Sequence, residues 1–492
     1  MRPEPQTLWD AMAAAAAVRP DAPAIDAPDG RFTYAELMQA AGAVAARLVA
    51  RGVGQGDRVA YLGLNGAAQI LLLLGCARIG AMFAPLNWRL VAAELQVILR
   101  DAAPGLLIAD AAMADLALAA KGRPAASVEV FMAKPWHETV PPQHPTPSDP
   151  VLLCYTSGAS GRPKGALHGQ TALLANAALA HDMHAMTAAD HVLTVLPLFH
   201  VGGMCIQTLP ALLIGARVTL MARFDPGACL DLIETARPAL TVQVPATMAA
   251  LLAHPRWAQA DLSSLRAITT GSTDVPVPMI DAVQVRGVPM IQIWGATETG
   301  PMAIYQQVAE AFSHPGAIGR PGPGVRLRLT DAGGHDVPPG AAGEIRVASA
   351  ALASGYWKRP DVDDLDGGWF RSGDVARQGA DGALWFLDRV SSVIISGGEN
   401  IYPAELERVL HDLPGLADAA IAARPDPRWG AVPVVVAVRA PGADLSAADI
   451  LAAFDGRIAR FKHPSAVVFV GALPRNAMGK VDRQRLGDMA AV

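Results

Sequence analysis

Short apolar runs bounded by turn residues recur along the larger, N-terminal part of the chain. Arg58–Leu62 and Leu106–Ala109 are two such runs, and their near-continuous apolar character is typical of buried strands. Ala67–Arg78 and Ala92–Ala102 are predicted to be helices. This alternation predicts an α/β architecture built in layers. Further strands are predicted at Val151–Tyr155, His191–Leu196, Arg217–Leu220, Leu240–Val244, Arg266–Thr270 and Met290–Ile293.

Two apolar stretches resemble membrane signals at first sight. Met12–Val18 is preceded by Glu4 and Asp10, which favours a first amphipathic helix over a signal peptide. Ala67–Leu86 is longer, but Arg78 interrupts it, which favours a buried helix followed by a turn over a membrane span. We therefore expect a soluble, cytoplasmic protein.

The composition changes near Leu387. Gly316–Phe386 is Gly-rich and β-like, whereas the residues after it predict a smaller unit with a helix that opens at Pro403. We therefore expect a large N-terminal domain of layered α/β subdomains plus a β-rich subdomain over 1–387. A small, mobile C-terminal α+β domain is expected over 388–492. Its further elements are predicted at Val432–Val438, Ala447–Ile458 and Val467–Val470.

Length and charge narrow the function. A chain of 492 residues is expected to form about two to four domains. The net charge of -5 provides no basic field for a nucleic-acid backbone, so no nucleic-acid partner is expected. The four cysteines form no C-x-x-C pair, so neither a zinc site nor a disulfide framework is indicated. Buried free thiols in a reducing compartment are expected instead.

The segment Tyr155–Gly165, YTSGASGRPKG, follows a predicted strand and has the chemistry of a phosphate cradle. Its glycines let backbone N–H groups turn toward an anion, and its hydroxyls and lysine add donors and charge. It does not fit the Walker A pattern. The alternative is a glycine-rich surface turn. The candidate phosphate ligands are Thr156, Ser157, Gly158, Ser160, Gly161 and Lys164.

This segment resembles the signature loop of the adenylate-forming superfamily, which includes acyl-CoA synthetases, luciferases and peptide-synthetase adenylation domains. The usual form is YTSGTTGxPKG, and Ala159 and Ser160 replace two threonines here. Other motifs of the family follow in order along essentially the whole chain. The segments of this chain that resemble them are Pro197–Gly203 (PLFHVGG), Ile293–Thr299 (IWGATET), Trp369–Asp374 (WFRSGD), Asp388–Arg389, Gly397–Pro403 (GGENIYP) and Pro474–Lys480 (PRNAMGK).

The resemblance implies how charge is handled during adenylation. A carboxylate must meet the α-phosphate of ATP, so positive charge and donors are needed where charge develops. Thr297 would hydrogen-bond the α-phosphate, and Glu298 would hold Mg²⁺, which prefers oxygen ligands. Lys480 would bridge the carboxylate and the α-phosphate. The alternatives are a surface carboxylate for Glu298 and a solvated lysine for Lys480.

The resemblance also assigns the nucleotide and coenzyme A contacts. Trp294 would stack on adenine, although a core tryptophan is the alternative. Asp374 would accept both ribose hydroxyls, and Arg389 would donate to the ribose or a phosphate. Asp388 would act as the hinge that turns the small domain toward coenzyme A. The remaining candidates are Gly271, Ser272, Thr273 and Gly295 for the nucleotide, and Gly397, Gly398 and Asn400 for coenzyme A.

The acyl pocket is expected after the motif at Pro197. By the resemblance, His200 closes the acyl channel until the adenylate forms; a structural histidine is the alternative. Val201–Gly215 and Leu240–Leu252 carry no Lys or Arg. A second substrate carboxylate would be buried there without a partner, so we expect an apolar acid, medium-chain fatty or aromatic. The predicted lining residues are His200, Val201, Gly202, Gly203, Met204 and Met302.

The predicted enzyme is an AMP-forming carboxylate–CoA ligase that uses ATP, Mg²⁺ and coenzyme A. It would form acyl-AMP and pyrophosphate, then a thioester and AMP. Alternatives are a ligase that loads a carrier-protein thiol, or a non-catalytic nucleotide-binding regulator, which an intact Lys480 and Glu298 disfavour. An amino-acid adenylation domain is disfavoured because no aspartate stands between Pro197 and Leu220. The expected partners are small molecules, and a homodimer stays open.

Overall fold

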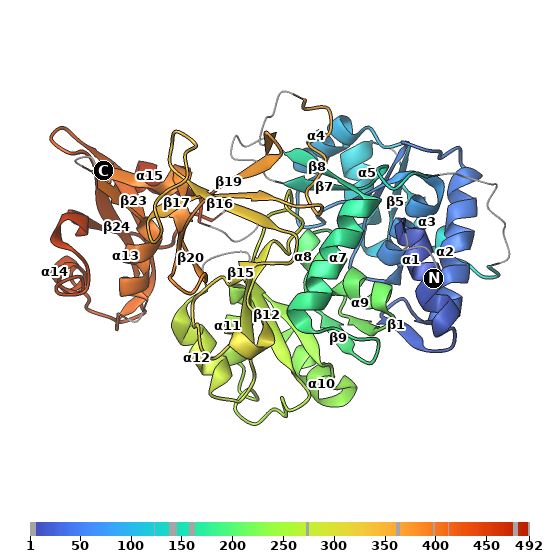
Figure 1. Cartoon of the computed structure of the whole chain (residues 1–492), viewed down its shortest axis with the longest axis horizontal. Helices are drawn as coiled ribbons and strands as arrows, with labels where there is room; N and C mark the ends of the chain where they lie inside the picture. The colour runs from blue at the N-terminus through green and yellow to red at the C-terminus, as the bar shows by residue number, and fades with distance from the viewer. Residues whose placement is uncertain are drawn as a thin grey trace. The chain divides into compact units, whose positions relative to one another are not determined.

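The structure is a computed structural model of the 492-residue chain (Figure 1). It describes residues 6–122, 124–136, 145–156, 163–271, 275–360, 365–396, 399–411, 413–475 and 481–490. The chain divides into two compact units, Met1–Leu327 with Val347–Phe370, and Arg328–Arg346 with Arg371–Val492. Layered α/β elements form the larger unit, as predicted. Asp388 lies inside the second unit, and the domain boundary expected there stays a prediction.

A nine-stranded sheet in the first unit has the order β15-β14-β13-β12-β11-β9-β10-β1-β2. Its inner strands β9 to β13 are parallel, and β2, β14 and β15 pair antiparallel at the two ends. Every residue of β11, β12 and β13 is buried, including the threonines and glutamines that these strands carry among their apolar residues. The bounds are β1 (Pro23–Ala27), β2 (Gly30–Thr33), β9 (His191–Thr194), β10 (Arg217–Leu220), β11 (Leu240–Gln243), β12 (Ala267–Gly271), β13 (Met290–Trp294), β14 (Ile304–Tyr305) and β15 (Arg320–Pro321).

A six-stranded sheet in the same unit has the order β6-β5-β3-β4-β7-β8. Its strands are parallel except for β8, which returns antiparallel to β7. The β7–β8 connection carries the predicted phosphate loop, and the two strands lie side by side in Figure 1. The bounds are β3 (Arg58–Leu62), β4 (Met82–Pro85), β5 (Leu106–Ala109), β6 (Ala126–Ser127), β7 (Pro150–Thr156) and β8 (Lys164–Gly169).

Helices of the first unit pack against these sheets. The long apolar stretch from Ala67 forms α3 (Ala67–Ile79), which is buried except at Arg78 and packs against α2 and β4. The residues after it form strand β4, where only a turn was predicted, because four apolar residues directly after a helix give no separate signal. The other bounds are α1 (Leu8–Val18), α2 (Tyr34–Val49), α4 (Ala92–Ala102), η1 (Ala111–Met113), α5 (Ala114–Lys121), α6 (Val128–Met132), α7 (Gln170–His184), α8 (Val201–Gly203), η2 (Met204–Thr208), α9 (Leu209–Ile214), α10 (Pro226–Ala236), α11 (Pro245–Leu252), α12 (Val277–Gln284) and η3 (Val308–Glu310).

Among the helices in the described part of the chain, none combines the length and the apolar character that crossing a membrane requires. The amphipathic helix predicted around Met12 is α1, and the Thr7 side chain caps it by accepting from the Asp10 amide. All four cysteines are free and buried, as predicted.

The second unit contains a sheet of order β22-β21-β24-β23, with β25 beside β24. Its core packs α13 and α14 against this sheet through Leu406, Ile450 and Val435. The helix predicted over Ala447–Ile458 ends at Ala452, so that prediction was too long. Gly456 takes a left-handed backbone with φ of 71° in the turn that follows. The bounds are β21 (Ile394–Ser396), β22 (Glu399–Ile401), α13 (Pro403–Leu410), β23 (Leu416–Asp426), β24 (Gly430–Arg439), α14 (Ala447–Ala452), η5 (Arg460–Lys462), β25 (Ala466–Phe469) and α15 (Arg483–Ala490).

A further sheet of order β16-β17-β19-β18, with β20 beside β19, includes the strands that carry the predicted ribose and hinge residues. It confirms the β-like character of the Gly-rich stretch before Leu387. The bounds are β16 (Arg326–Thr330), β17 (Ala342–Ala348), β18 (Leu365–Asp366), β19 (Trp369–Gln378), β20 (Leu384–Arg389) and η4 (Val390–Ser392).

Candidate active site

The predicted acyl and adenine segments begin where parallel strands of the nine-stranded sheet end. The motif at Pro197 follows β9, Gly271 ends β12, and Trp294 ends β13. Carboxyl ends of parallel strands share one edge of a sheet, which is where α/β proteins bind ligands. Gly271 lies opposite Ile293 in the β12–β13 register, and a Cβ at Gly271 would approach the Ile293 carbonyl oxygen to 2.4 Å. The close approach of the strands therefore requires glycine.

A tight turn after β13 carries the predicted phosphate and metal residues. A Cβ at Gly295 would lie 2.5 Å from the Pro301 carbonyl oxygen, so the chain folds back closely on itself. The Thr299 hydroxyl accepts from the Ala296 amide at 2.8 Å and closes the turn. Thr297 and Glu298 are partly exposed on this turn, whereas Trp294 is only 7% exposed. Adenine stacking by Trp294 stays a prediction.

The phosphate loop is anchored at both ends by the β7–β8 hairpin. Thr156 pairs with Lys164, and its hydroxyl donates to the Lys164 carbonyl oxygen at 3.5 Å. Thr156 and Lys164 are therefore held at the base of the predicted cradle. Four of the predicted phosphate ligands lie outside the described residues, namely Ser157, Gly158, Ser160 and Gly161.

Tyr356, which the sequence analysis did not single out, connects the phosphate loop with the turn that carries Glu298. Its hydroxyl donates to Glu298 Oε1 at 2.7 Å, and Lys164 Nζ lies 4.9 Å from the centre of its ring. Backbone contacts hold it in place, because Tyr356 pairs with Ala166 and the Ala353 amide donates to the Glu298 carbonyl oxygen at 2.8 Å. The structure thus brings Lys164 and Glu298 onto the same tyrosine.

The segment around His200 is held from two sides. The buried Asn65 side chain donates to the Leu196 carbonyl oxygen at 2.9 Å and accepts from the Leu198 amide at 2.9 Å. These two hydrogen bonds fix the backbone on both sides of Pro197. Cys154 of β7 lies 3.5 Å from the Phe199 carbonyl oxygen, and burial raises the pKa of its thiol to about 12. The Phe199 and His200 rings lie 4.5 Å apart. These contacts place the segment next to the strand that leads into the phosphate loop.

The predicted acyl-pocket residues are largely buried. Gly202 and Gly203 line a narrow hollow, and Val201, Met204 and Met302 are at most 8% exposed. A Cβ at Gly203 would approach the Pro197 carbonyl oxygen to 2.2 Å, so only glycine fits there. Among the described residues, no charged side chain lines the hollow; those that line it are Thr194, Val195, Leu196, Gly202, Gly203, Gln207, Thr208 and Val242.

A buried histidine lies behind the turn that carries Glu298. His168 of β8 is 1% exposed, and burial lowers the pKa of its imidazole to about 4. The Thr297 backbone acts in the opposite direction on the same ring. The His168 ring is therefore neutral at pH 7.

In the second unit, the ribose candidates face each other across two strands. Asp374 of β19 lies opposite Arg389 of β20, and Arg389 Nε lies 2.8 Å from Asp374 Oδ1. The hinge candidate Asp388 is buried and accepts from the Arg389 and Ala404 amides at 2.7 Å each. Burial raises the pKa of its carboxyl. Asn400 pairs with Ile395 through the backbone. The predicted residues Ser272, Thr273, Gly397, Gly398 and Lys480 lie outside the described residues.

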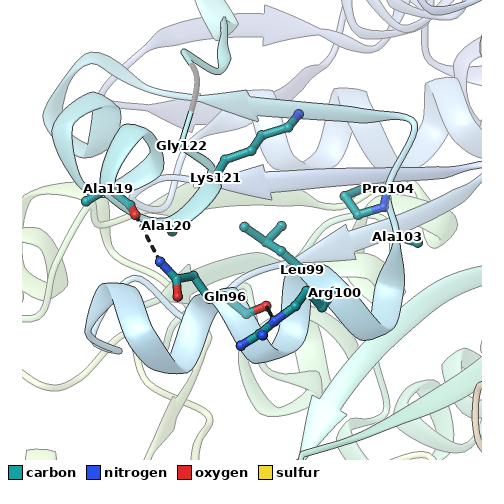
Figure 2. A pocket seen from close by; sticks show the side chains of 9 residues that line it. All are labelled: Gln96, Leu99, Arg100, Ala103, Pro104, Ala119, Ala120, Lys121 and Gly122. Atoms are coloured by element: carbon teal, nitrogen blue, oxygen red, sulfur yellow. Dashed lines mark hydrogen bonds between the residues drawn. The ribbon is translucent and has the colours of Figure 1, made fainter.

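A larger surface hollow lies between α4 and α5 (Figure 2). Arg100 and Lys121 border it, and Leu99 points into it. None of the predicted site residues that the structure describes lines this hollow. It therefore adds nothing to the site at the strand ends.

Family models and known proteins decide between the possibilities that this geometry leaves. Residues 12–357 match the family described as AMP-binding enzyme, and residues 405–480 match the AMP-binding enzyme C-terminal domain. The chain belongs to the AMP-binding enzyme family. An indoleacetate–CoA ligase from Aromatoleum aromaticum is 44% identical, with 97% of this chain and 96% of the relative covered. A feruloyl-CoA synthase from an Amycolatopsis species is 40% identical, with 95% of each chain covered.

A solved structure agrees with these relatives. ATP-bound MatB from Rhodopseudomonas palustris superposes with a TM-score of 0.89 at 29% identity, and 98% of each chain is covered. The resemblance to adenylate-forming enzymes and the prediction of an AMP-forming carboxylate–CoA ligase are thereby confirmed. The roles expected of individual site residues stay predictions.

Proposed function

We propose that this enzyme activates an aromatic carboxylic acid with ATP and transfers the acyl group to the thiol of coenzyme A. The uncharged hollow beside Gly202 and Gly203 is the observation that carries the choice of acid. A second carboxylate there would lose its hydration without gaining a partner. The two relatives, an indoleacetate–CoA ligase and a feruloyl-CoA synthase, support the same class of acid.

The proposed reaction has two steps. A carboxylate oxygen attacks the α-phosphorus of ATP and pyrophosphate leaves. The thiol sulfur of coenzyme A then attacks the acyl carbon, and AMP leaves. In the first step, Lys164 and Thr297 would offer a charge and a hydroxyl to the phosphates. Both are held by backbone pairing or by a closed turn, so little reorganisation is needed when charge develops.

Glu298 fits the role of a Mg²⁺ ligand. Its carboxylate is partly exposed, and Tyr356 holds one of its oxygens. Within the described residues, no group of three or more His, Cys, Asp or Glu side chains could hold a metal ion. A Mg²⁺ ion at Glu298 would therefore share the phosphate oxygens of ATP, as this ion commonly does in proteins. Bound there, Mg²⁺ would neutralise part of the triphosphate charge.

An acid panel tests the proposal. Pyrophosphate release and the mass of the thioester are measured with indole-3-acetate, ferulate, phenylacetate, octanoate, malonate and succinate. We expect the aromatic acids to react fastest and the dicarboxylates slowest. Faster turnover of malonate or succinate than of every aromatic acid would overturn it. Thioester formation with a carrier protein but not with coenzyme A would favour the carrier-loading alternative.

A further inference from the structure

The hollow beside Gly202 and Gly203 contains one unusual polar group. Three of its lining residues have polar side chains: Thr194, Thr208 and Gln207. The Thr194 and Thr208 hydroxyls lie 2.7 Å apart, and Thr208 donates to the Gly203 carbonyl oxygen at 2.6 Å. Gln207 is 1% exposed, and its Oε1 atom has no hydrogen-bond partner among the residues that the structure describes. Buried polar atoms almost always have a partner, so this acceptor calls for an explanation.

The backbone around Gln207 is also unusual. It lies in η2, a π-helical stretch of five buried residues between α8 and α9. Such π-helical turns occur frequently at functional sites, because the extra residue per turn redirects a side chain. Here the turn follows directly on the segment that carries His200 and Gly203.

A buried network fixes which end of the Gln207 amide faces the hollow. Gln207 Nε2 lies 3.1 Å from both His184 Nε2 and the Thr269 hydroxyl. His184 Nδ1 lies 2.8 Å from the Ala180 carbonyl oxygen, which can only accept, so Nδ1 carries the proton. Burial lowers the pKa of this ring to about 4, so its Nε2 atom is an acceptor at neutral pH. Rotating the amide would set Oε1 against that acceptor.

The acceptor atom Oε1 is therefore held on the side of the amide away from His184. The hollow is too narrow for a free water molecule, so water does not satisfy this atom, and an acyl group must move lining side chains to reach it. A ring N–H or O–H group on the acyl moiety has the matching chemistry. It is neutral, it donates, and an aromatic ring can carry it.

We infer that Gln207 is a specificity-determining residue that accepts a hydrogen bond from a neutral N–H or O–H donor on the aromatic acyl group. This inference rests on the proposed function and narrows it. An acid that carries such a donor satisfies a buried acceptor, whereas a donor-free acid of the same shape leaves it unsatisfied. A site of this kind rejects the analogue that lacks the hydrogen-bonding group.

Pairs of acids that differ at the donor group test the inference in the wild-type enzyme. Indole-3-acetate is compared with benzothiophene-3-acetate, and 4-hydroxycinnamate with cinnamate, by the kcat/KM of pyrophosphate release. We expect the donor-bearing acid of at least one pair to be favoured by about 5- to 100-fold. Equal kcat/KM within both pairs would overturn the role of Gln207 while leaving the proposed function intact. No pyrophosphate release with any of these acids would instead count against the proposed function.

Two matched variants identify the residue responsible. Gln207→Met removes the acceptor at similar length, so the preference within the pair should fall to about one- to twofold. Gln243→Met is the control, because Gln243 is also buried with an unpartnered Oε1 atom. Gln243 follows Val242 on β11, and neighbouring side chains on a strand point to opposite faces, so only Val242 lines the hollow.

A structural role for Gln207 would lower kcat/KM for both acids of a pair equally and would leave their ratio unchanged. The inference would be overturned if Gln207→Met left the ratio of the two kcat/KM values at its wild-type value. It would also be overturned if Gln243→Met lowered that ratio as much as Gln207→Met does. If Gln207→Met fails to fold, the wild-type pairs still decide, because they need no variant.

Discussion

Polar groups around Glu298 are charged and partly exposed, whereas those around Gln207 are neutral and buried. Glu298 and Lys164 meet at Tyr356, on backbone turns and strand ends that solvent reaches. Gln207, His184 and Thr269 are each at most 1% exposed. Both regions lie near the ends of strands in the same unit. The first keeps its charged groups partly hydrated, whereas the second buries only neutral groups.

The degree of burial determines which polar groups each region can use. Ionised groups keep part of their hydration at the phosphate side, so they need no buried counter-charge before ATP arrives. On the acyl side, a neutral imidazole and an amide position a single acceptor without burying a charge. Phosphate handling and acyl selection should therefore respond differently to mutation.

The largest expected effect is on the phosphate side. Glu298→Gln keeps the shape and the hydrogen bond from Tyr356 but removes the charge. We expect the adenylation rate to fall by about 10²–10³-fold, as when one preorganised electrostatic group is removed. The Mg²⁺ concentration needed for half-maximal rate should rise. Binding of Mn²⁺ in the presence of an ATP analogue, followed by electron paramagnetic resonance, should weaken in parallel. A Mg²⁺ titration that overlays wild type would show the assignment to be wrong.

Acid should destabilise both regions through their buried imidazoles. Burial lowers the pKa of His168 and of His184 from 6.5 to about 4. Between these pH values each imidazole is protonated in the unfolded chain but neutral in the folded chain. The contribution to folding stability is therefore fully present above pH 6.5 and decreases as the pH falls toward 4. Each ring should account for about 3 kcal/mol.

The measurement is the thermal midpoint from pH 7.5 down to 4.5 in His168→Gln and His184→Gln. Each variant should show a shallower loss of Tm toward low pH than wild type. His335→Gln is the control, because its side chain is 83% exposed. Identical pH profiles for all four proteins would contradict the assignment of buried neutral rings.

Two neighbouring glycines on the acyl side are expected to differ in how well they tolerate a side chain. A Cβ at Gly203 would lie 2.2 Å from the Pro197 carbonyl oxygen, whereas one at Gly202 would meet nothing closer than 3.9 Å. Gly203→Ala should therefore cost about 1–3 kcal/mol of stability and slow adenylation, as overpacking does. Gly202→Ala should leave stability near the wild-type value. Thermal unfolding of both variants gives the comparison, and equal losses would refute it.

Local sequence patterns predict the strands and motifs of the phosphate side well, because apolar runs and glycines act over a few residues. They fail where partners are distant in the chain. Tyr356 is placed by pairing with Ala166 and by its bond to Glu298, and no local pattern reveals either. Strand β23 was missed because its alanine-rich sequence has low strand propensity, and pairing with β24 overrides it.

The sequence does contain an indication that Gln207 is buried. It stands within Val201–Gly215, an otherwise largely apolar stretch, and such a lone amide predicts a buried polar group. Its partners His184 and Thr269 could not be found from sequence, because they come from α7 and β12. The network exists only once the sheet and its covering helix are packed.

The smallest expected effect tests whether Tyr356 positions Glu298 or only fills space. Tyr356→Phe removes the hydroxyl that donates to Glu298 Oε1 at 2.7 Å and keeps the ring beside Lys164. Losing one hydrogen bond to a carboxylate should slow adenylation by about tenfold. The carboxylate would then be less restrained, so the Mg²⁺ requirement should shift in the same direction as in Glu298→Gln, but less.

A hydroxyl–carboxylate bond elsewhere in the same unit supplies the control. Tyr305 donates to Asp182 Oδ2 at 2.8 Å, and neither residue contributes to the contacts of Tyr356 with Glu298 and Lys164. Tyr305→Phe should change stability by a similar amount and leave the Mg²⁺ titration unchanged, because neither partner belongs to the phosphate side. In the background of Glu298→Gln, Tyr356→Phe should cost less than in wild type, since its hydroxyl then meets a neutral amide. Full additivity of the two substitutions would mean that Tyr356 acts independently of Glu298, and the comparison between the two regions would then rest on Glu298 and Lys164 alone.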